Sequence, residues 1–453
     1  MERTLTTEAR RPAEQPALVR ALGLWETSAI VVGIMIGTAI FLVPADITRQ
    51  VGSPRAALAV WLVGGLLSLL GALSFAELAA MFPHSGGQYV FLREAYGPLV
   101  AFLCGWSFFV SAQTGGISVL AVGFAEYLGE LVPLSPWELK AAAAGAIAAF
   151  TAINYLGVRE GGAVQSLLTG FKTAAVAGLI ILGFALVRGT PGGVPSLPLP
   201  KGSSFAASFG VALVAAFWAY EGWNCATFVG GEVKHAERNL PLALILGTSA
   251  VIALYLGLNL VYYHVLSVPE VAQSPRVAAA MAARFLGRPG ALFVTWLIIA
   301  STLGSVNGSV LAAPRVYYAM AKDGVFFRWC AVVHPRFRTP HLALLLQGAL
   351  AILLVLLGTY EQLYTYVIFA AWAFYALTAL AVVVLRRKRP DLPRPYRVWG
   401  YPVVPLAFVA AATWFLGNML VQKPTEAGWG CLILLAGIPV YFVWKKRGVR
   451  KSV

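Results

Sequence analysis

GIMIGTAIF, residues 33–41, lies in the middle of the first long apolar segment of the chain, residues 24–49. Two glycines four positions apart, Gly33 and Gly37, are followed by Thr38 and the small Ala39. Glycine costs about 1 kcal/mol relative to alanine in a helix interior, so this stretch is a weak point in a membrane helix. The sequence therefore predicts that the first apolar helix is broken here.

A second weak point, FWAYEGWN at residues 217–224, lies in the sixth apolar segment. It places an acid (Glu221), a glycine (Gly222) and an amide (Asn224) at membrane depth. Backbone that leaves a helix inside a bilayer is tolerated only where it is buried in protein or lines a cavity. Two such breaks, in matching positions of two halves of a chain, indicate a transporter binding site.

The composition supports a membrane protein. Of the 453 residues, 59% are hydrophobic and 12% are charged, and the mean hydropathy is +0.76. Soluble domains are roughly 45–50% apolar and 25% charged. Because a helix needs about 20 apolar residues to cross a bilayer, we expect an all-α integral membrane protein. Its twelve candidate spans are residues 24–49, 55–81, 97–129, 138–156, 164–187, 206–230, 240–267, 289–320, 341–358, 362–385, 402–421 and 428–444.

The net charge of +15 is explained by topology rather than by nucleic-acid binding. If the N-terminal tail is inside, most of the 34 Lys and Arg residues fall in inside segments. The positive-inside rule then places both termini in the cytoplasm of a multi-pass protein of the cell membrane. The basic runs at 386–389 and 445–447 serve as topology and anionic-lipid signals.

Residue types typical of enzymes, metal sites and disulfides are sparse. The four cysteines fall in spans or in an inside loop, so we expect no disulfide-linked partner subunit. The sequence has no Cys/His cluster with metal spacing, no catalytic acid pair, no P-loop and no nucleophile–base pair. We therefore expect neither a metal, nor a cofactor, nor an enzymatic activity.

A Pro/Gly-rich outside loop, residues 191–200, divides the chain. On that division, residues 21–190 and residues 201–386 each hold five spans. Two further spans lie in residues 401–445, and the two ends of the chain are polar tails, 1–20 and 446–453. Because five is odd, the two halves enter the membrane from opposite sides, as inverted repeats require.

Lys172 lies in the fifth span, about eight residues from its inside end. This places its Cα about 12 Å into the helix. The side chain either snorkels to the surface or faces the interior, where ionisable groups have functional roles. The neighbouring Thr169 and Thr173 slightly favour the interior.

Several motifs resemble the amino acid–polyamine–organocation superfamily, and within it the branch that is similar to L-type amino acid transporters. The resemblance covers about residues 20–445 and is specific only when its motifs are taken together. These motifs are GTAIF at 37–41, AEL at 76–78 with SGGQY at 85–89, WAYEGWN at 218–224, RNLP at 238–241, GSVNGS at 304–309 and RPDLPRPY at 389–396.

The resemblance implies a LeuT-type fold: twelve spans, a 5+5 inverted repeat, broken helices 1 and 6, and amino acid transport by alternating access. The substrate carboxylate would accept hydrogen bonds from the N–H groups of Gly37, Thr38, Ala39 and Ile40, at a helix N-terminus. The carbonyls around Trp218, Ala219 and Tyr220 would hold the α-ammonium.

The resemblance also assigns roles to single side chains. Trp218 matches an aromatic gate, the alternative being an aromatic packed in the bundle. Lys172, with Ser305, would replace a structural sodium ion. The expected function is therefore sodium-independent exchange of neutral amino acids.

Two residues depart from the family pattern. Ala39 replaces a glycine, and its methyl group would narrow the carboxylate site. Glu221 stands where many relatives have glycine, and it either selects a cationic side chain, couples protons or pairs within the bundle. A proton-coupled or cationic amino acid permease is therefore the alternative, and a non-transporting amino acid sensor or a channel remains open.

Overall fold

The structure, a computed structural model, describes residues 17–188, 196–200, 202, 204–357, 360–422 and 424–449. Residues 1–16 and 450–453, which belong to the two expected tails, lie outside the described residues, as do residues 189–190 at the end of the first expected repeat and residues 191–195 of the predicted boundary loop.

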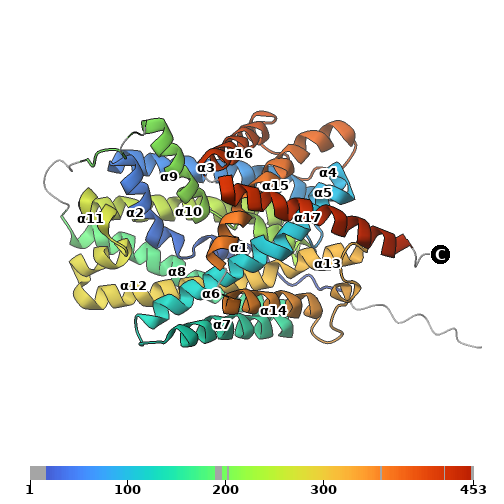
Figure 1. Ribbon diagram of the computed structural model, residues 1–453, viewed down its shortest axis with the longest axis horizontal. Helices are drawn as coiled ribbons and strands as arrows, with labels where there is room; N and C mark the ends of the chain where they lie inside the picture. The colour runs from blue at the N-terminus through green and yellow to red at the C-terminus, as the bar shows by residue number, and fades with distance from the viewer. Residues whose placement is uncertain are drawn as a thin grey trace, which may run out of the picture.

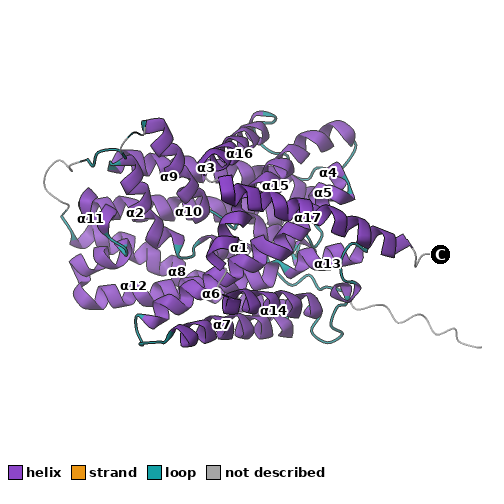
Figure 2. Ribbon diagram, viewed as in Figure 1, coloured by secondary structure: helices purple, strands orange, loops and turns teal. Residues whose placement is uncertain are grey.

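Helices joined by loops make up the described part of the chain, which has two isolated β-bridges and no strand (Figures 1 and 2). The α-helices are α1 (Leu24–Met35), α2 (Ala39–Val51), α3 (Pro54–Met81), α4 (Gln88–Tyr96), α5 (Pro98–Ser107), α6 (Gln113–Gly129), α7 (Pro136–Leu156), α8 (Val158–Leu186), α9 (Phe205–Ala219), α10 (Ala236–Val265), α11 (Val268–Gln273), α12 (Val277–Ala312), α13 (Pro314–Lys322), α14 (His341–Leu357), α15 (Tyr360–Lys388), α16 (Val403–Gln422) and α17 (Pro424–Val449).

All twelve predicted apolar segments fall on these helices. Among the described residues, nine helical runs are long and apolar enough to cross a bilayer, and the bent pair α1 and α2 makes a tenth. Of the two remaining predicted segments, one falls on α14, a shorter apolar helix, and the other on α15.

The predicted break in the first helix is present between α1 and α2, whose axes meet at 43°. Gly33, in the last turn of α1, allows α8 to approach closely. A Cβ at this position would lie 2.0 Å from Nε2 of Gln165 and 2.3 Å from Oγ1 of Thr169. A larger residue here would force the side chains of Gln165 and Thr169 to move, so Gly33 permits the close packing of α1 on α8.

The second predicted break follows α9, which ends at Ala219. Gly222 has a φ of 109°, in the left-handed region that side chains disfavour. A Cβ on it would lie 2.4 Å from Cγ2 of Ile34 in α1. The chain then continues as a short 3₁₀ helix, Trp223–Phe228, so the second break packs directly against the first.

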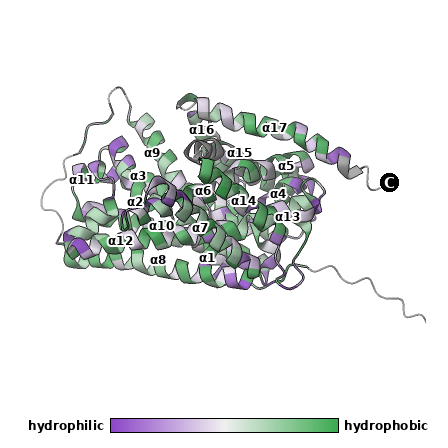
Figure 3. Cartoon of the chain, turned by 60° about the horizontal axis from the view of Figure 1, so that its bottom comes forward, coloured by the Kyte–Doolittle hydropathy of each residue, from purple (hydrophilic) through white to green (hydrophobic). Residues whose placement is uncertain are grey.

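The helix α1 lies at the centre of the bundle, where it contacts α8, α10 and α12 (Figure 1). The pair α7 and α14 packs together at the lower edge of this view. In the rotated view, α17 runs along the upper edge, and it packs on α5 and α15 (Figure 3). The residues at the two breaks, among them Ile36, Ala219 and Tyr220, are buried within the bundle.

Candidate functional site

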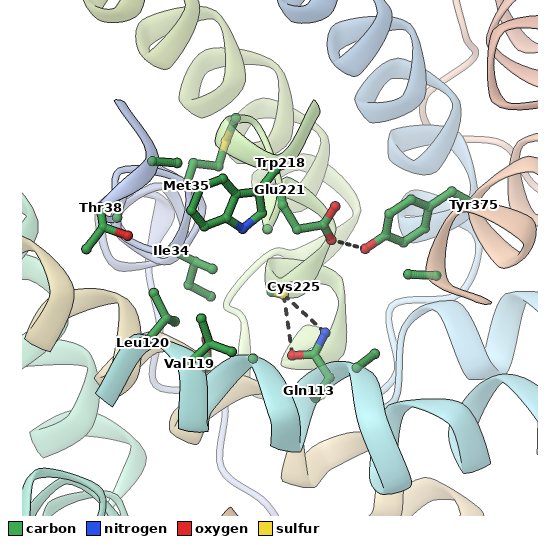
Figure 4. A pocket seen from close by; sticks show the side chains of 17 residues that line it. Ile34, Met35, Thr38, Gln113, Val119, Leu120, Trp218, Glu221, Cys225 and Tyr375 are labelled. Carbon is green, nitrogen blue, oxygen red and sulfur yellow. Dashed lines mark hydrogen bonds between the residues drawn. The ribbon is translucent and has the colours of Figure 1, made fainter. Parts of the chain in front are cut away.

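The two breaks enclose a cavity of about 110 Å³. One water molecule needs about 10–15 Å³ of such space, so the cavity accommodates a small organic molecule. Figure 4 shows side chains from α1, α6, α9 and α15 converging on it. Its lining comprises Ile34, Met35, Gly37, Thr38, Ala39, Ala112, Gln113, Gly116, Val119, Leu120, Trp218, Glu221, Gly222, Cys225, Ser309, Ala371 and Tyr375.

The N-terminus of α2 forms one wall of this cavity. The first hydrogen bond of this helix runs from Phe41 N–H to the Thr38 carbonyl at 3.0 Å, so the N–H groups of Thr38, Ala39 and Ile40 precede it. Gly37 N–H instead donates to the Met35 carbonyl at 2.9 Å. Free N–H groups at a helix N-terminus favour an anion. Thr38 and Ala39 line the cavity, whereas Ile40 is buried outside its lining.

The end of α9 forms the facing wall. Trp218 lines the cavity, and Figure 4 shows its indole ring projecting over it. The structure places Ala219 and Tyr220 in the packed core, outside the lining. The Ala219 carbonyl accepts a hydrogen bond from the Tyr255 hydroxyl at 3.0 Å, and the Trp218 carbonyl accepts one from Glu221 N–H at 3.2 Å.

Tyr255 of α10 connects the two breaks. Its hydroxyl lies 2.7 Å from the Met35 carbonyl and 3.0 Å from the Ala219 carbonyl. One hydroxyl proton is therefore within hydrogen-bond reach of the carbonyls at the ends of both α1 and α9.

Lys172 turns into the bundle and is fully buried. Its Nζ donates to the carbonyls of Gly33 (2.5 Å), Ile36 (2.8 Å) and Ser301 (2.9 Å). Ser305 Oγ lies 3.5 Å from the same nitrogen and also donates to the Gly33 carbonyl at 3.0 Å. The ammonium group thus occupies a cage of oxygens where α1 unwinds, and of the two directions left open by the sequence it takes the inward one.

A polar cluster forms a further part of the cavity wall. The Tyr375 hydroxyl donates to the Glu221 carboxylate and lies 3.4 Å from Asn224 Oδ1 (Figure 4). The side-chain amide of Gln113 contacts the Cys225 thiol at 3.9 Å. Over the described ranges, no Lys, Arg or His nitrogen lies within 4 Å of the Glu221 carboxylate. The partner of Glu221 is therefore a neutral hydroxyl.

Sequence reasoning did not identify Gln113, Cys225 and Tyr375 as site residues. Each comes from a different element, and each belongs to the lining. The sequence does single out Gln113, because an amide side chain is unusual in an apolar span. It does not indicate which neighbouring helix this side chain faces.

Charged residues at one end of the bundle form networks outside the cavity. Arg315 and Glu232 make a fully buried ion pair with contacts of 2.6 and 3.0 Å. In the adjacent short helix α4, the Tyr89 hydroxyl donates to Asp323 at 2.7 Å, and burial together with this carboxylate raises the pKa of Tyr89. These contacts tie the start of α13, through Arg315, to the segment that follows α9, and its end, through Asp323, to the segment that follows α3.

Residues 22–443 match the model of a protein family described as amino acid permease. The serine/threonine exchanger SteT of Bacillus subtilis (strain 168) is 34% identical over 437 residues, which cover 96% of this chain and 99% of the relative. The human b(0,+)-type amino acid transporter 1 is 33% identical over 439 residues, covering 94% and 88%. The human cystine/glutamate transporter is 29% identical over 442 residues, covering 96% and 87%.

Proposed function

The chain belongs to the amino acid permease family and is a membrane-embedded amino acid transporter, and from this premise we propose that it exchanges neutral amino acids by alternating access, without sodium. The observation that carries the proposal is the cavity between the two breaks, with a helix N-terminus on one side and a helix C-terminus on the other.

A free amino acid fits such a cavity because it is a zwitterion. The N–H groups of Thr38, Ala39 and Ile40 would bind its carboxylate, and Gly37 would join them when its bond to Met35 opens. The carbonyls of Trp218, Ala219 and Tyr220, at the C-terminal end of α9 and just after it, would hold the α-ammonium against the negative end of the helix dipole. A sugar or a lipid carries no such pair of charges.

Lys172 supports independence from sodium. Its ammonium group already bridges α1 and α12 through three carbonyls, next to the hydroxyl of Ser305. In our proposal this fixed cation replaces a bound sodium ion, so the bent conformation of α1 is stabilised without binding an ion from solution.

Trp218 is proposed as the gate, since it lines the cavity and stands at the end of the rigid part of α9. A rotation of its ring would close the substrate off from one side of the membrane. Exchange is compatible with the similarity of this chain to SteT, a serine/threonine exchanger.

Glu221 supports a second candidate function. Its carboxylate lines the cavity and is bonded to Tyr375 rather than to a cation. It is therefore available to couple protons or to bind a cationic substrate side chain, as in a proton-coupled or cationic permease. A sensor would keep the same cavity but would bind without turnover.

We also propose the membrane arrangement. Twelve spans would be organised as inverted repeats 21–190 and 201–386, followed by 401–445, with both termini cytoplasmic because the basic segments then lie inside. The protein would act without a disulfide-linked subunit, because no cysteine lies in an outside loop on this topology.

Radiolabelled uptake into proteoliposomes tests these proposals. Serine uptake in sodium-free buffer only into vesicles preloaded with unlabelled amino acid would support exchange. Uptake into empty vesicles that rises with an inward proton gradient, or a preference for arginine, would favour the second candidate. Saturable binding with no flux in any arrangement would indicate a sensor.

A further inference from the structure

A row of hydrogen-bonded amide side chains lies behind the cavity wall and joins four helices. Asn154 of α7 donates to Asn307 of α12 at 2.8 Å, and Asn307 donates to Gln165 of α8 at 2.9 Å. Gln165 in turn donates to the backbone carbonyl of Ala29 in α1 at 3.2 Å. These three side chains form the amide ladder. None of them belongs to the lining of the cavity.

The amide ladder is enclosed in protein along its whole length. Asn154, Asn307 and Gln165 are each at most 1% exposed. Burying an amide is unfavourable unless its hydrogen bonds are made, so the ladder stabilises the arrangement of helices in which its members meet. Each donor points toward the next helix, and the series ends on α1.

The ladder reaches α1 one helical turn before the break. Ala29 is four residues before Gly33, whose carbonyl accepts a hydrogen bond from Lys172. In addition to its donor within α1, the Ala29 carbonyl accepts from the Thr169 hydroxyl of α8 at 3.0 Å. Two successive turns of α1 are therefore held against α8, the first by neutral side chains and the second by an ammonium group.

The same contacts are adjacent to the cavity. Gly308 follows Asn307 in α12, and a Cβ at Gly308 would lie 2.6 Å from Ile34 and 3.0 Å from Gln165 Nε2. Ile34 lines the cavity, as does Ser309, the next residue of α12. A movement of α1 away from α8 would therefore separate the end of the ladder and displace a wall of the cavity.

We propose that Gln165 and Asn307 are positioning residues for transport, which keep the cavity closed on the side where α1 begins. In the structure this side is closed, since Ile30 and Val31 of α1 are fully buried. Gln165 acts through the Ala29 carbonyl, and Asn307 acts by orienting Gln165. Opening breaks the hydrogen bond between α8 and α1, while those between α7, α12 and α8 remain. The proposal rests on alternating access as the mode of transport.

The Cys225 thiol provides a probe of opening, because it lines the cavity and is 2% exposed. The purified full-length protein is treated with N-ethylmaleimide in the absence of substrate, and modification of Cys225 is followed by peptide mass spectrometry. Gln165→Leu should accelerate this modification about fivefold, which corresponds to the loss of one hydrogen bond from the closed form. Thr169→Val, which preserves the shape of the side chain, should act in the same direction.

Gln347→Leu is the matched control. Gln347 is also a buried glutamine, in α14, but neither of its side-chain amide atoms has a hydrogen-bond partner among the described residues. This substitution should leave the modification of Cys225 unchanged. Cys104 is buried in α5 outside the cavity lining, and its modification should stay equally slow in all variants, because the opening is local.

Three results would overturn the proposal. The first is an unchanged rate at Cys225 in both Gln165→Leu and Thr169→Val. The second is an equal acceleration at Cys104, which would indicate general loosening of the fold. The third is an equal effect of Gln347→Leu.

Asn307→Ala tests the indirect role. Alone, it should accelerate Cys225 modification less than Gln165→Leu does. Added to Gln165→Leu, it should have no further effect, because the two residues belong to one network. An effect of the same size in both backgrounds would contradict a role that acts through Gln165. Absence of exchange by the parent protein would refute the proposed function, whereas the thiol measurement uses no substrate and tests the ladder alone.

Discussion

Replacing Lys172 with alanine removes the only ammonium group from the oxygen cage at the break of α1. Three carbonyls, those of Gly33, Ile36 and Ser301, lose a donor at 2.5–2.9 Å. Two serine hydroxyls remain nearby. Ser301 Oγ donates to the Ile36 carbonyl at 2.7 Å, and Ser305 Oγ lies 3.0 Å from the Gly33 carbonyl.

The magnitude follows from this balance of donors and acceptors. The two hydroxyl protons still reach the carbonyls of Ile36 and Gly33, and the Ser301 carbonyl keeps its helical N–H donor inside α12, so what is lost is the charge-assisted hydrogen bonding of the ammonium group. Such a loss costs about 1–3 kcal/mol. If the cost falls on the bent form of α1, substrate affinity should fall roughly 5- to 150-fold, at 1.4 kcal/mol for each tenfold change.

The assay is exchange of radiolabelled serine by proteoliposomes in sodium-free buffer, compared with thermal unfolding of the same preparations. Lys140→Ala is the control, because the Lys140 ammonium donates only to the Leu356 carbonyl near the end of α14. Sodium should restore part of the exchange by Lys172→Ala, because the vacated cage is lined by oxygens. Exchange at the parent rate without sodium would refute the reasoning.

Four other single substitutions test separate parts of the structure. Glu221→Gln should abolish the pH dependence of uptake and retain exchange if this carboxylate couples protons; an unchanged pH profile would exclude that role. Gly222→Ala should lower the free energy of unfolding by about 2–4 kcal/mol, because it combines a φ of 109° with a Cβ placed 2.4 Å from a side chain of α1. Gly170→Ala, where a Cβ meets open space, should instead stabilise by up to about 1 kcal/mol in the same denaturation experiment. Arg315→Met should lower the free energy of unfolding by about 3–5 kcal/mol, because it leaves the Glu232 carboxylate buried without a partner. Adding Glu232→Leu should recover most of this loss. A double variant that is no more stable than Arg315→Met would contradict the role of this buried ion pair.

The helices and their two weak points could be predicted from the sequence. Every apolar segment had to become a helix, because a membrane-embedded backbone must satisfy its own hydrogen bonds. Glycines at Gly33 and Gly222 marked the breaks for a local reason, namely their low helix propensity and their access to positive φ. What the local pattern could not show is that the missing side chains also create space, for α8 at the first break and for Ile34 at the second.

The cavity wall was decided by tertiary structure. Gln113, Cys225 and Tyr375 come from elements that are far apart in sequence, and only packing brings them to one wall. Tyr255 joins both breaks through a single hydroxyl, although nothing in its surroundings along the chain distinguishes it from a packed aromatic.

Lys172 shows the division between the two levels most clearly. Its position in the sequence determined its depth, and at that depth an ammonium group must either reach the surface or find oxygen partners. The choice between these outcomes depended on the carbonyls of Gly33 and Ile36, which lie where α1 ends, and on the Ser301 carbonyl of the neighbouring α12. Sequence periodicity specifies where a helix runs, whereas the partners of a buried charge are specified only when distant helices pack.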